Sequence, residues 1–309
     1  MVVLQIEKYK DFTVYKNNEK NIFIHIDIDS DDFCKKILMC FLDESKLLNY
    51  ISNKTDIKFS GTKKDFVKLH KKINDFFDEE NLKIDEDDLK KELENYIDWE
   101  KYDKKELLTL RRDKVGKIGE YIFHNILIDY FDSLCIVPKL NLTTNRNMSI
   151  YGIDVIFYNP SNNTLMFGES KVSKSLDNGI SLVNDSLKNY EHQIFEEYRA
   201  ILSSDVINIS NLPKELKKYI DTCIDFKRFI NEANIKTITI PIFIMHGLEH
   251  DIDEIFQKLN KLKKTTVLDL DINYIIISLP IIDKNRFQSC LIEFLRERIE
   301  YYESMSQQI

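Results

Sequence analysis

Glycine and proline are scarce in this chain, which contains 7 and 5 of them among 309 residues. The sequence shows no low-complexity tract and no internal repeat, and 43% of its residues are hydrophobic and 31% charged. Such a composition is typical of a globular protein and excludes wholesale disorder. Because glycine is rare, each position where it occurs is informative about the local backbone.

Disulfide pairs and long apolar runs are absent as well. The five cysteines include no CxxC pair, and an odd, scattered set is no disulfide framework, which fits a reducing cytosol. The longest apolar runs, ITIPIFIM and YIIISLPII, are too short to span a bilayer. The first charged side chain is already at Glu7, which interrupts the apolar N-terminal run, so no signal peptide is visible. We therefore expect a soluble, cytoplasmic protein.

An excess of positive charge is the third absence, because the formal net charge is −8. Proteins that coat nucleic acid regardless of its sequence are usually basic, since they neutralise phosphates. The charge argues against such a coat protein, but not against an enzyme with a local basic surface or one that receives DNA from a partner. Basic clusters at 63–72, 214–218 and 261–264 are candidates for phosphate contacts, although such clusters more often form a solvated surface.

The pattern changes near residue 111, which predicts two regions. Residues 1–110 form an N-terminal α+β region with strands in 2–28, a helix from Ser30 and a charged helical segment over 65–110. This region carries no catalytic signal, and we assign it to regulation or partner docking. The elements predicted in residues 111–309 are a helix over 111–131, a strand over 134–138, a hairpin over 152–171, a long helix over 181–202, strands over 235–247 and 266–280, and a helix over 285–305. Helices on both sides of these strands predict an α/β layered core.

The letters ESK occur twice, at Glu44–Lys46 and at Glu169–Lys171. The first copy lies in a predicted helix, where side chains two residues apart diverge by about 200°, so we interpret it as surface decoration. The second copy ends the apolar run TLMFG, which is typical of a strand. Because side chains two residues apart on a strand share a face, Glu169 and Lys171 are predicted to project together.

A third charged residue belongs to the same predicted hairpin. Asp154 lies in the run YGIDVIFY, and aspartate is disfavoured in strands, so its presence there needs a reason. If the two strands pair through the turn YNPSNN, Asp154 lies beside Glu169. Two glycines in the preceding helix, Gly116 and Gly119, permit a close backbone approach at a cost of about 1 kcal/mol each. They place Glu120 on the helix predicted to pack against this sheet.

These four residues have a common chemistry. Two or three carboxylates form a hard oxygen site suited to Mg²⁺ or Mn²⁺. Such a metal polarises a phosphoryl oxygen and activates a bound water, and a nearby lysine helps to hold that water and to stabilise the developing charge. The alternative is a buried cluster of ion pairs without chemistry.

The segments KIGE (117–120), GID (152–154) and GESK (168–171) together resemble the PD-(D/E)xK phosphodiesterase superfamily. The resemblance implies a restriction-endonuclease-like core, a central mixed sheet flanked by helices. It implies metal ligands at Asp154, Glu169 and the backbone carbonyl of Ser170, with Lys171 handling water. It further implies that Glu120 lies at or near a second metal or a water. Ile153 stands where many members have proline.

Many members of that superfamily carry Gln or Tyr on the helix after the lysine. Here NYEHQIFEEYR offers Gln193 and Tyr198, whose spacing departs from the QxxxY pattern. Gln193 is therefore only a weak candidate for a catalytic role, and a solvent-facing glutamine is the competing interpretation.

The stretches GKIGEYIFHNIL, YGIDVIFYNPSNNTLMFGESK and IPIFIMHG more narrowly resemble the HamA family, the nuclease subunits of the Hachiman anti-phage defence system. This resemblance implies a magnesium-dependent nuclease that cleaves DNA. It also implies a superfamily-2 helicase partner, HamB, that restrains the nuclease until foreign or damaged DNA is engaged.

Two alternatives remain open. One is an interaction subunit that keeps the fold without catalysis. Another is a zinc protease, since His246, Glu249 and His250 match the pattern H-x-x-E-H, although that pattern requires a helix and here follows a strand-like run. Finally, His124 is more typical of a packed or surface histidine than of a ligand.

Overall fold

The computed structural model describes most of the chain after residue 111 and three N-terminal strands. The described residues are 4–8, 12–17, 21–28, 112–131, 133–137, 153–203, 214–223, 225–247 and 251–280, with the single residues 297, 300, 301 and 304. The predicted helices over 30–51 and 65–110, the Glu44–Lys46 copy of ESK and the basic cluster at 63–72 lie outside these residues, as does most of the predicted helix over 285–305.

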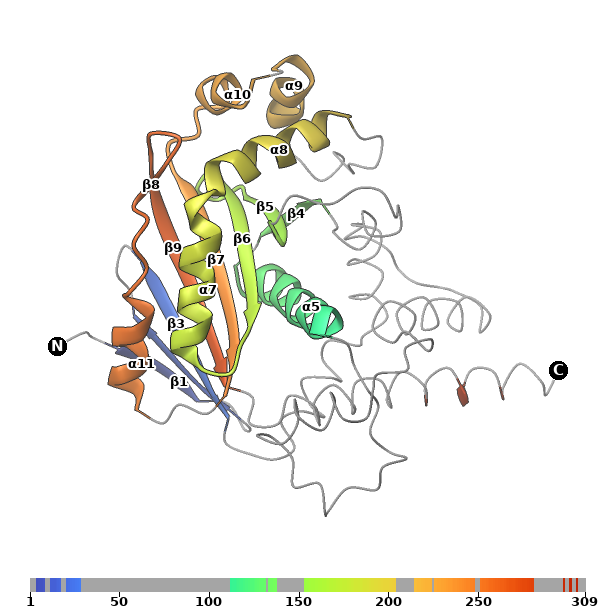
Figure 1. Ribbon diagram of the computed structural model, residues 1–309. Helices are drawn as coiled ribbons and strands as arrows, with labels where there is room; N and C mark the ends of the chain where they lie inside the picture. Colours follow the sequence, from blue (N-terminus) through green and yellow to red (C-terminus); the bar gives the residue numbers. More distant parts are fainter. Residues whose placement is uncertain are drawn as a thin grey trace.

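The fold is α/β, as predicted, with one large mixed sheet and helices against it (Figure 1). The strand order is β1-β2-β3-β9-β7-β6-β5-β4, and β8 pairs with β9. The strands are β1 (Leu4–Lys8), β2 (Phe12–Asn17), β3 (Ile22–Ile28), β4 (Leu134–Val137), β5 (Val155–Asn159), β6 (Thr164–Val172), β7 (Ile238–His246), β8 (Thr266–Val267) and β9 (Leu270–Pro280).

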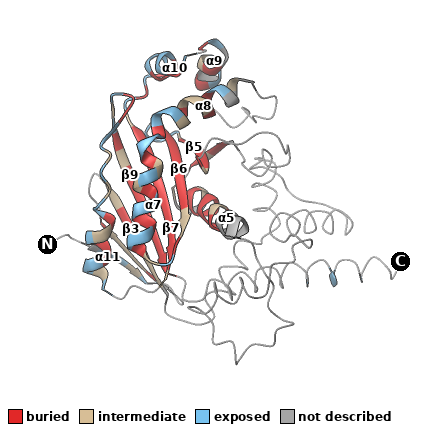
Figure 2. Cartoon of the chain, in the orientation of Figure 1, coloured by how far each residue is buried: buried red, intermediate tan, exposed pale blue. Residues whose placement is uncertain are grey.

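The centre of the sheet is parallel and its flanks are antiparallel. Strands β3, β9, β7 and β6 pair in parallel, whereas β1–β2–β3 and β4–β5–β6 pair antiparallel. Every residue of β7 is buried (Figure 2), which is typical of a central parallel strand covered on both faces. The N-terminal strands continue the sheet that carries the later elements.

The predicted hairpin over 152–171 is confirmed as β5 and β6, joined by a turn that ends at Asn163 with a φ of 52°. The strand expected over 266–280 is confirmed as β9 from Leu270 onward, but residues 266–269 instead form β8 and a turn, so this segment is a second hairpin. Its two-residue turn, Leu268 and Asp269, has φ values of 55° and 64°. Positive φ at both positions is the geometry that matches the twist of two paired strands.

The helices lie on both faces of the sheet and at one end of it. They are α5 (Arg112–Phe131), α7 (Leu176–Lys188), α8 (Tyr190–Ser203), α9 (Lys214–Thr222), α10 (Phe226–Glu232) and α11 (Ile252–Leu259). One long helix over 181–202 was predicted, and this is wrong: the helix breaks at Asn189 and α8 leaves at an angle to α7 (Figure 1). Helix α7 begins earlier than predicted, because the Ser175 side chain accepts a hydrogen bond from the Asn178 N–H and caps the helix there.

The opposite faces of the sheet are covered by α5 and α7. Phe123 of α5 stacks on Phe243 of β7 with ring centroids 5.8 Å apart. On the other face, Gly179 lies so close to Ile244 that a Cβ atom there would be 2.4 Å from a methyl carbon. Because side chains alternate along a strand, neighbouring residues of β6 face these two helices in turn. In the described residues, no helix is long and apolar enough to cross a membrane.

Candidate active site

Asp154 immediately precedes β5 and is tied to β6 at two points. Its backbone N–H donates to the Gly168 carbonyl at 2.9 Å, and its Oδ2 accepts from the Ser170 N–H at 2.6 Å. Val155 pairs with Gly168, so Asp154 continues the ladder opposite Glu169. The structure therefore brings Asp154 beside the second ESK, as predicted, although Asp154 lies just before the strand rather than inside it.

Glu169 and Lys171 project together from β6. The Lys171 Nζ atom lies 2.6 Å from Glu169 Oε2, while the Glu169 side chain is fully buried and the Lys171 side chain is 21% exposed. The other carboxylate oxygen, Glu169 Oε1, is buried without a hydrogen-bond partner. Burial of a carboxylate oxygen without a hydrogen bond is costly, because the oxygen loses its water and gains no replacement.

The environment shifts both pKa values upward. Burial raises the pKa of the Glu169 carboxyl to about 7, and the nearby Asp154 carboxylate acts in the same direction, against the Lys171 ammonium. Burial alone would lower the pKa of Lys171, but the neighbouring carboxylates, that of Glu169 foremost, outweigh it and the pKa is raised. Charges this close together in a buried place are typical of a functional site and also of structural ion pairs.

Helix α5 reaches the end of β6 because of a glycine. A Cβ atom at Gly119 would lie 3.0 Å from both Ser170 Oγ and Val172 Cγ2, so only glycine permits the observed approach without adjustment. The next residue, Glu120, is partly buried and lies near enough to contribute to the raised pKa of Lys171. Ser170 and Val172 face α5, so Glu120 approaches from the side of the sheet opposite Glu169.

Two residues that the sequence analysis missed complete the buried side of the site. The Tyr190 hydroxyl, at the start of α8, donates to the Phe167 carbonyl at 2.6 Å, two residues before Glu169. Burial raises the pKa of Tyr190 well above its usual value, so its hydroxyl remains a donor. The Ser186 hydroxyl of α7 lies near the Glu169 carboxyl and lowers its pKa, but Oε1 still lacks a hydrogen bond of good geometry.

The weaker helix candidates occupy different places. Gln193 lies one turn beyond Tyr190 on α8, half-buried, with its Oε1 buried and without a hydrogen-bond partner. Tyr198 points away from the site, because its hydroxyl donates to the Cys223 carbonyl at 2.6 Å. His124 is packed edge-on against Phe157, and burial lowers its pKa to about 3, as expected of a neutral core histidine.

The side chains fit a hard divalent cation held in part by groups outside the protein. Within the described residues, no three His, Cys, Asp or Glu side chains converge to hold a metal. Two carboxylates with water and substrate phosphates are the usual ligands of Mg²⁺. The Ser170 N–H points toward Asp154, and the N–H and C=O of one strand residue point to the same side, so its carbonyl shares that direction.

The zinc-protease pattern is not supported at its first residue. His246 is the last residue of strand β7, whereas the pattern requires a helix. Its Nε2 lies 2.7 Å from Ser278 Oγ and its Nδ1 lies 2.5 Å from the Gly247 carbonyl, so both ring nitrogens have partners. Glu249 and His250 lie outside the described residues.

Comparison with known proteins identifies the family. No curated protein and no solved structure matches this chain. A family model described as HamA matches residues 4–295 of the 309, which includes every element described above. The chain therefore belongs to the HamA family, and this membership supports a role in anti-phage defence.

Proposed function

We propose that this protein is a metal-dependent nuclease that hydrolyses phosphodiester bonds in DNA and works with a superfamily-2 helicase in antiviral defence. One observation carries the proposal: Glu169 is a fully buried carboxylate with one oxygen unpartnered, beside Asp154 and 2.6 Å from Lys171. A structural ion pair gains nothing from such an oxygen, whereas a metal site uses it.

The groups that would hold Mg²⁺ or Mn²⁺ are the carboxylates of Asp154 and Glu169 and the Ser170 carbonyl. Bound there, the ion supplies Lewis acidity to a phosphoryl oxygen and to a water. The Ser170 N–H donates to Asp154 Oδ2 at 2.6 Å and so fixes the orientation of this carboxylate. Glu120, which approaches from the opposite face, is proposed to orient a water at the edge of this site.

Lys171 is proposed to stabilise negative charge on the phosphate. Its ion pair with Glu169 keeps it a cation, and its partial exposure leaves ammonium protons available toward solvent. A cation already oriented before the substrate arrives stabilises developing charge with little rearrangement. The ion pair between Glu169 and Lys171 therefore holds the lysine charged and oriented, and this lysine acts on the phosphate by its charge and by hydrogen bonding.

The scaffold holds these groups in place. Tyr190 fixes the Phe167 carbonyl, Gly168 allows β5 and α5 to approach β6, and Asp154 bridges the two strands. A catalytic constellation needs such support, because small displacements of its groups have a large effect on rate. A helicase partner would deliver DNA to a chain whose net charge of −8 gives it little general attraction for phosphates.

A cleavage assay tests the proposal. Plasmid and single-stranded DNA are incubated with the full chain and Mg²⁺ or Mn²⁺, or with EDTA, with and without the neighbouring helicase and ATP. We expect cleavage that EDTA abolishes, that Lys171→Ala and Glu169→Gln each reduce by at least about 100-fold, and that Lys46→Ala leaves unchanged.

Lys46→Ala is the matched control, because it removes the same residue type from the same three-letter pattern. If wild type cuts nothing even with the helicase and ATP, or if Lys171→Ala cuts as well as wild type, the nuclease proposal fails. The interaction-subunit alternative would then explain the fold.

A further inference from the structure

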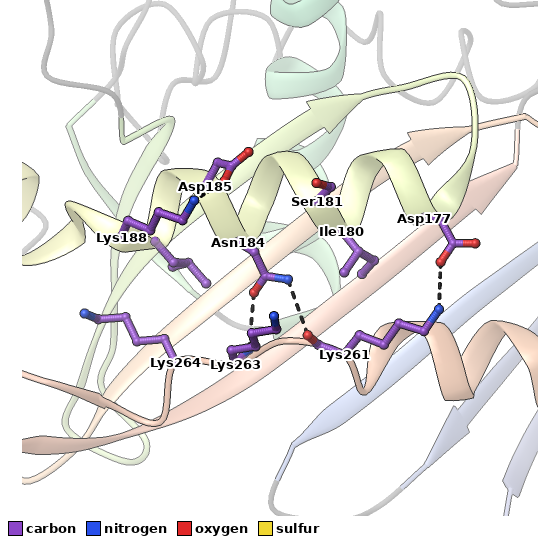
Figure 3. Close-up of a pocket in the computed structure, with 10 residues that line it drawn as sticks. Asp177, Ile180, Ser181, Asn184, Asp185, Lys188, Lys261, Lys263 and Lys264 are labelled. Atoms are coloured by element: carbon purple, nitrogen blue, oxygen red, sulfur yellow. Dashed lines mark hydrogen bonds and ion pairs between the residues drawn. The ribbon is translucent and has the colours of Figure 1, made fainter.

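A groove on the outer side of α7 is not used by the proposed reaction. It has a volume of about 550 Å³ and lies between α7 and the segment that joins α11 to β8 (Figure 3). Its lining consists of Asp177, Ile180, Ser181, Asn184, Asp185, Leu187 and Lys188 of α7 with Lys261, Lys263 and Lys264. The last three belong to one of the basic clusters noted in the sequence.

The lysine-bearing segment is fixed against α7 by its backbone. Asn184 donates from Nδ2 to the Lys261 carbonyl at 3.3 Å and accepts at Oδ1 from the Lys263 N–H at 3.2 Å (Figure 3). The Tyr274 hydroxyl donates to the Lys264 carbonyl at 2.6 Å. A single asparagine and a tyrosine thus hold the backbone at Lys261, Lys263 and Lys264, so these lysines emerge from an ordered edge of the groove.

The groove is positive in a protein that is negative as a whole. Four lysines and two aspartates line it, a formal excess of two positive charges, while the whole chain has −8. Asp177 is neutralised at one end by Lys261 at 2.9 Å and by Lys258 at 3.2 Å. At the other end Lys264 approaches Glu191 only to 3.8 Å.

Lys263 contributes a positive charge that no ion pair offsets among the described residues. Among the residues that the structure describes, no carboxylate forms an ion pair with its ammonium, although its backbone is held by Asn184. Lys188 pairs with Asp185 at 2.6 Å, and Lys264 lies at the end of the groove away from the Asp177–Lys261 pair (Figure 3). Lys263 and the loosely paired Lys264 therefore give the lysine-bearing edge of the groove a positive charge, which suits an anion with several oxygens.

We propose that this groove binds the phosphate backbone of the nucleic-acid strand at a distance from the bond that is cut. This inference rests on the proposed function, because it assumes that nucleic acid is the substrate. One helix borders both places, since α7 presents Ser186 toward Glu169 and presents Asn184 and Lys188 to the groove. Lysines that contact phosphates position a strand without reading its sequence, which suits a nuclease that must hold DNA delivered by a motor.

The test measures binding without cleavage. The full chain carrying Lys171→Ala is titrated, in EDTA, against fluorescein-labelled single-stranded DNA of about 20 nucleotides, and anisotropy is followed from about 50 to about 200 mM salt. The groove variant is Lys263→Gln with Lys264→Gln. The control is Lys227→Gln with Lys236→Gln, two exposed lysines outside the basic clusters.

We expect the groove variant to bind about tenfold more weakly and its log–log salt slope to fall by about 1.4, which is two single-strand phosphate contacts. The control pair is expected to leave both quantities unchanged. Equal slopes in the groove variant and the parent overturn the proposal, as does an equal loss in the control. Loss of helicase binding with DNA binding intact also overturns it, in favour of a protein-docking groove.

The outcome is separable from the nuclease proposal. Binding in EDTA does not depend on the metal or on Lys171, so a protein that binds through the groove and never cuts would refute the nuclease function alone. If the protein cuts DNA but Lys263 and Lys264 have no influence on DNA binding, only the groove proposal is refuted.

Discussion

Asp154 and Ser170 are joined by a hydrogen bond of 2.6 Å from the Ser170 N–H to the Asp154 carboxylate. The bond links the start of β5 to the middle of the ESK segment, so it fixes the distance between Asp154 and the strand that carries Lys171. The same carboxylate serves as a structural acceptor and as a proposed metal ligand, and these two roles are separable by mutation.

Asp154→Asn separates them. The amide oxygen still accepts from Ser170 N–H, so we expect the midpoint of thermal unfolding to change by less than about 3 °C. The negative charge is gone, so we expect DNA cleavage to fall at least about 100-fold. Thermal unfolding and the plasmid assay check the two outcomes. Unchanged cleavage by a well-folded Asp154→Asn protein would contradict the assignment of Asp154 as a ligand.

Gly168→Ala tests the packing beside the site. A Cβ atom at Gly168 would lie 2.4 Å from Val155 Cγ2 and 3.0 Å from two ring atoms of Phe123, so β5 or α5 must shift. We expect the free energy of unfolding to fall by about 1–3 kcal/mol, measured with urea, because overpacking forces neighbours from their positions.

Gly119→Ala is the comparison for that variant. Its Cβ contacts are both 3.0 Å, and alanine gains about 1 kcal/mol of helix propensity, which offsets part of the strain. Gly119→Ala is therefore expected to be less destabilising than Gly168→Ala. The reverse order would show that α5 is held against β6 more rigidly than β5 is.

Local patterns predicted the hairpin that carries the site. Alternating apolar residues and the turn YNPSNN identify β5 and β6, and the two-residue period of a strand then places Glu169 and Lys171 on one face. These features depend on neighbours in the chain, so a single sequence contains them. The approach of α5 followed from the rarity of glycine, and Gly119 confirms it.

Features set by distant contacts were not predictable in this way. Asn189 ends α7 in the middle of an uninterrupted helical pattern, and the change of direction lets Tyr190 reach Phe167. The β8–β9 turn uses Leu268 and Asp269 where glycine or asparagine is usual, so no turn signal marked it. The parallel order β3-β9-β7-β6 joins segments far apart in the chain.

Tyr190→Phe tests a positioning role that follows from that break. The variant keeps the ring and leaves the buried Phe167 carbonyl unpartnered, so we expect a loss of about 1–3 kcal/mol in the free energy of unfolding. Tyr198→Phe removes an equal 2.6 Å bond to the Cys223 carbonyl and is the control. Both variants should lose stability, but only Tyr190→Phe should lower cleavage, measured where both remain folded. Equal activities would make Tyr190 purely structural.

Two buried histidines make stability depend on pH. Burial, with a contribution from His246, lowers the pKa of His25 to about 4, and burial lowers that of His124 to about 3. These two histidines take up protons below about pH 6.5 in the unfolded chain but not in the native state, so their contribution to stability is fully present above that pH. It should fall between about pH 6.5 and 4, by up to about 3 kcal/mol for His25. Urea unfolding across this range measures the slope, which His25→Asn should reduce and His192→Asn, at an exposed position on α8, should not. An unchanged slope in His25→Asn would show that other groups cause the acid sensitivity.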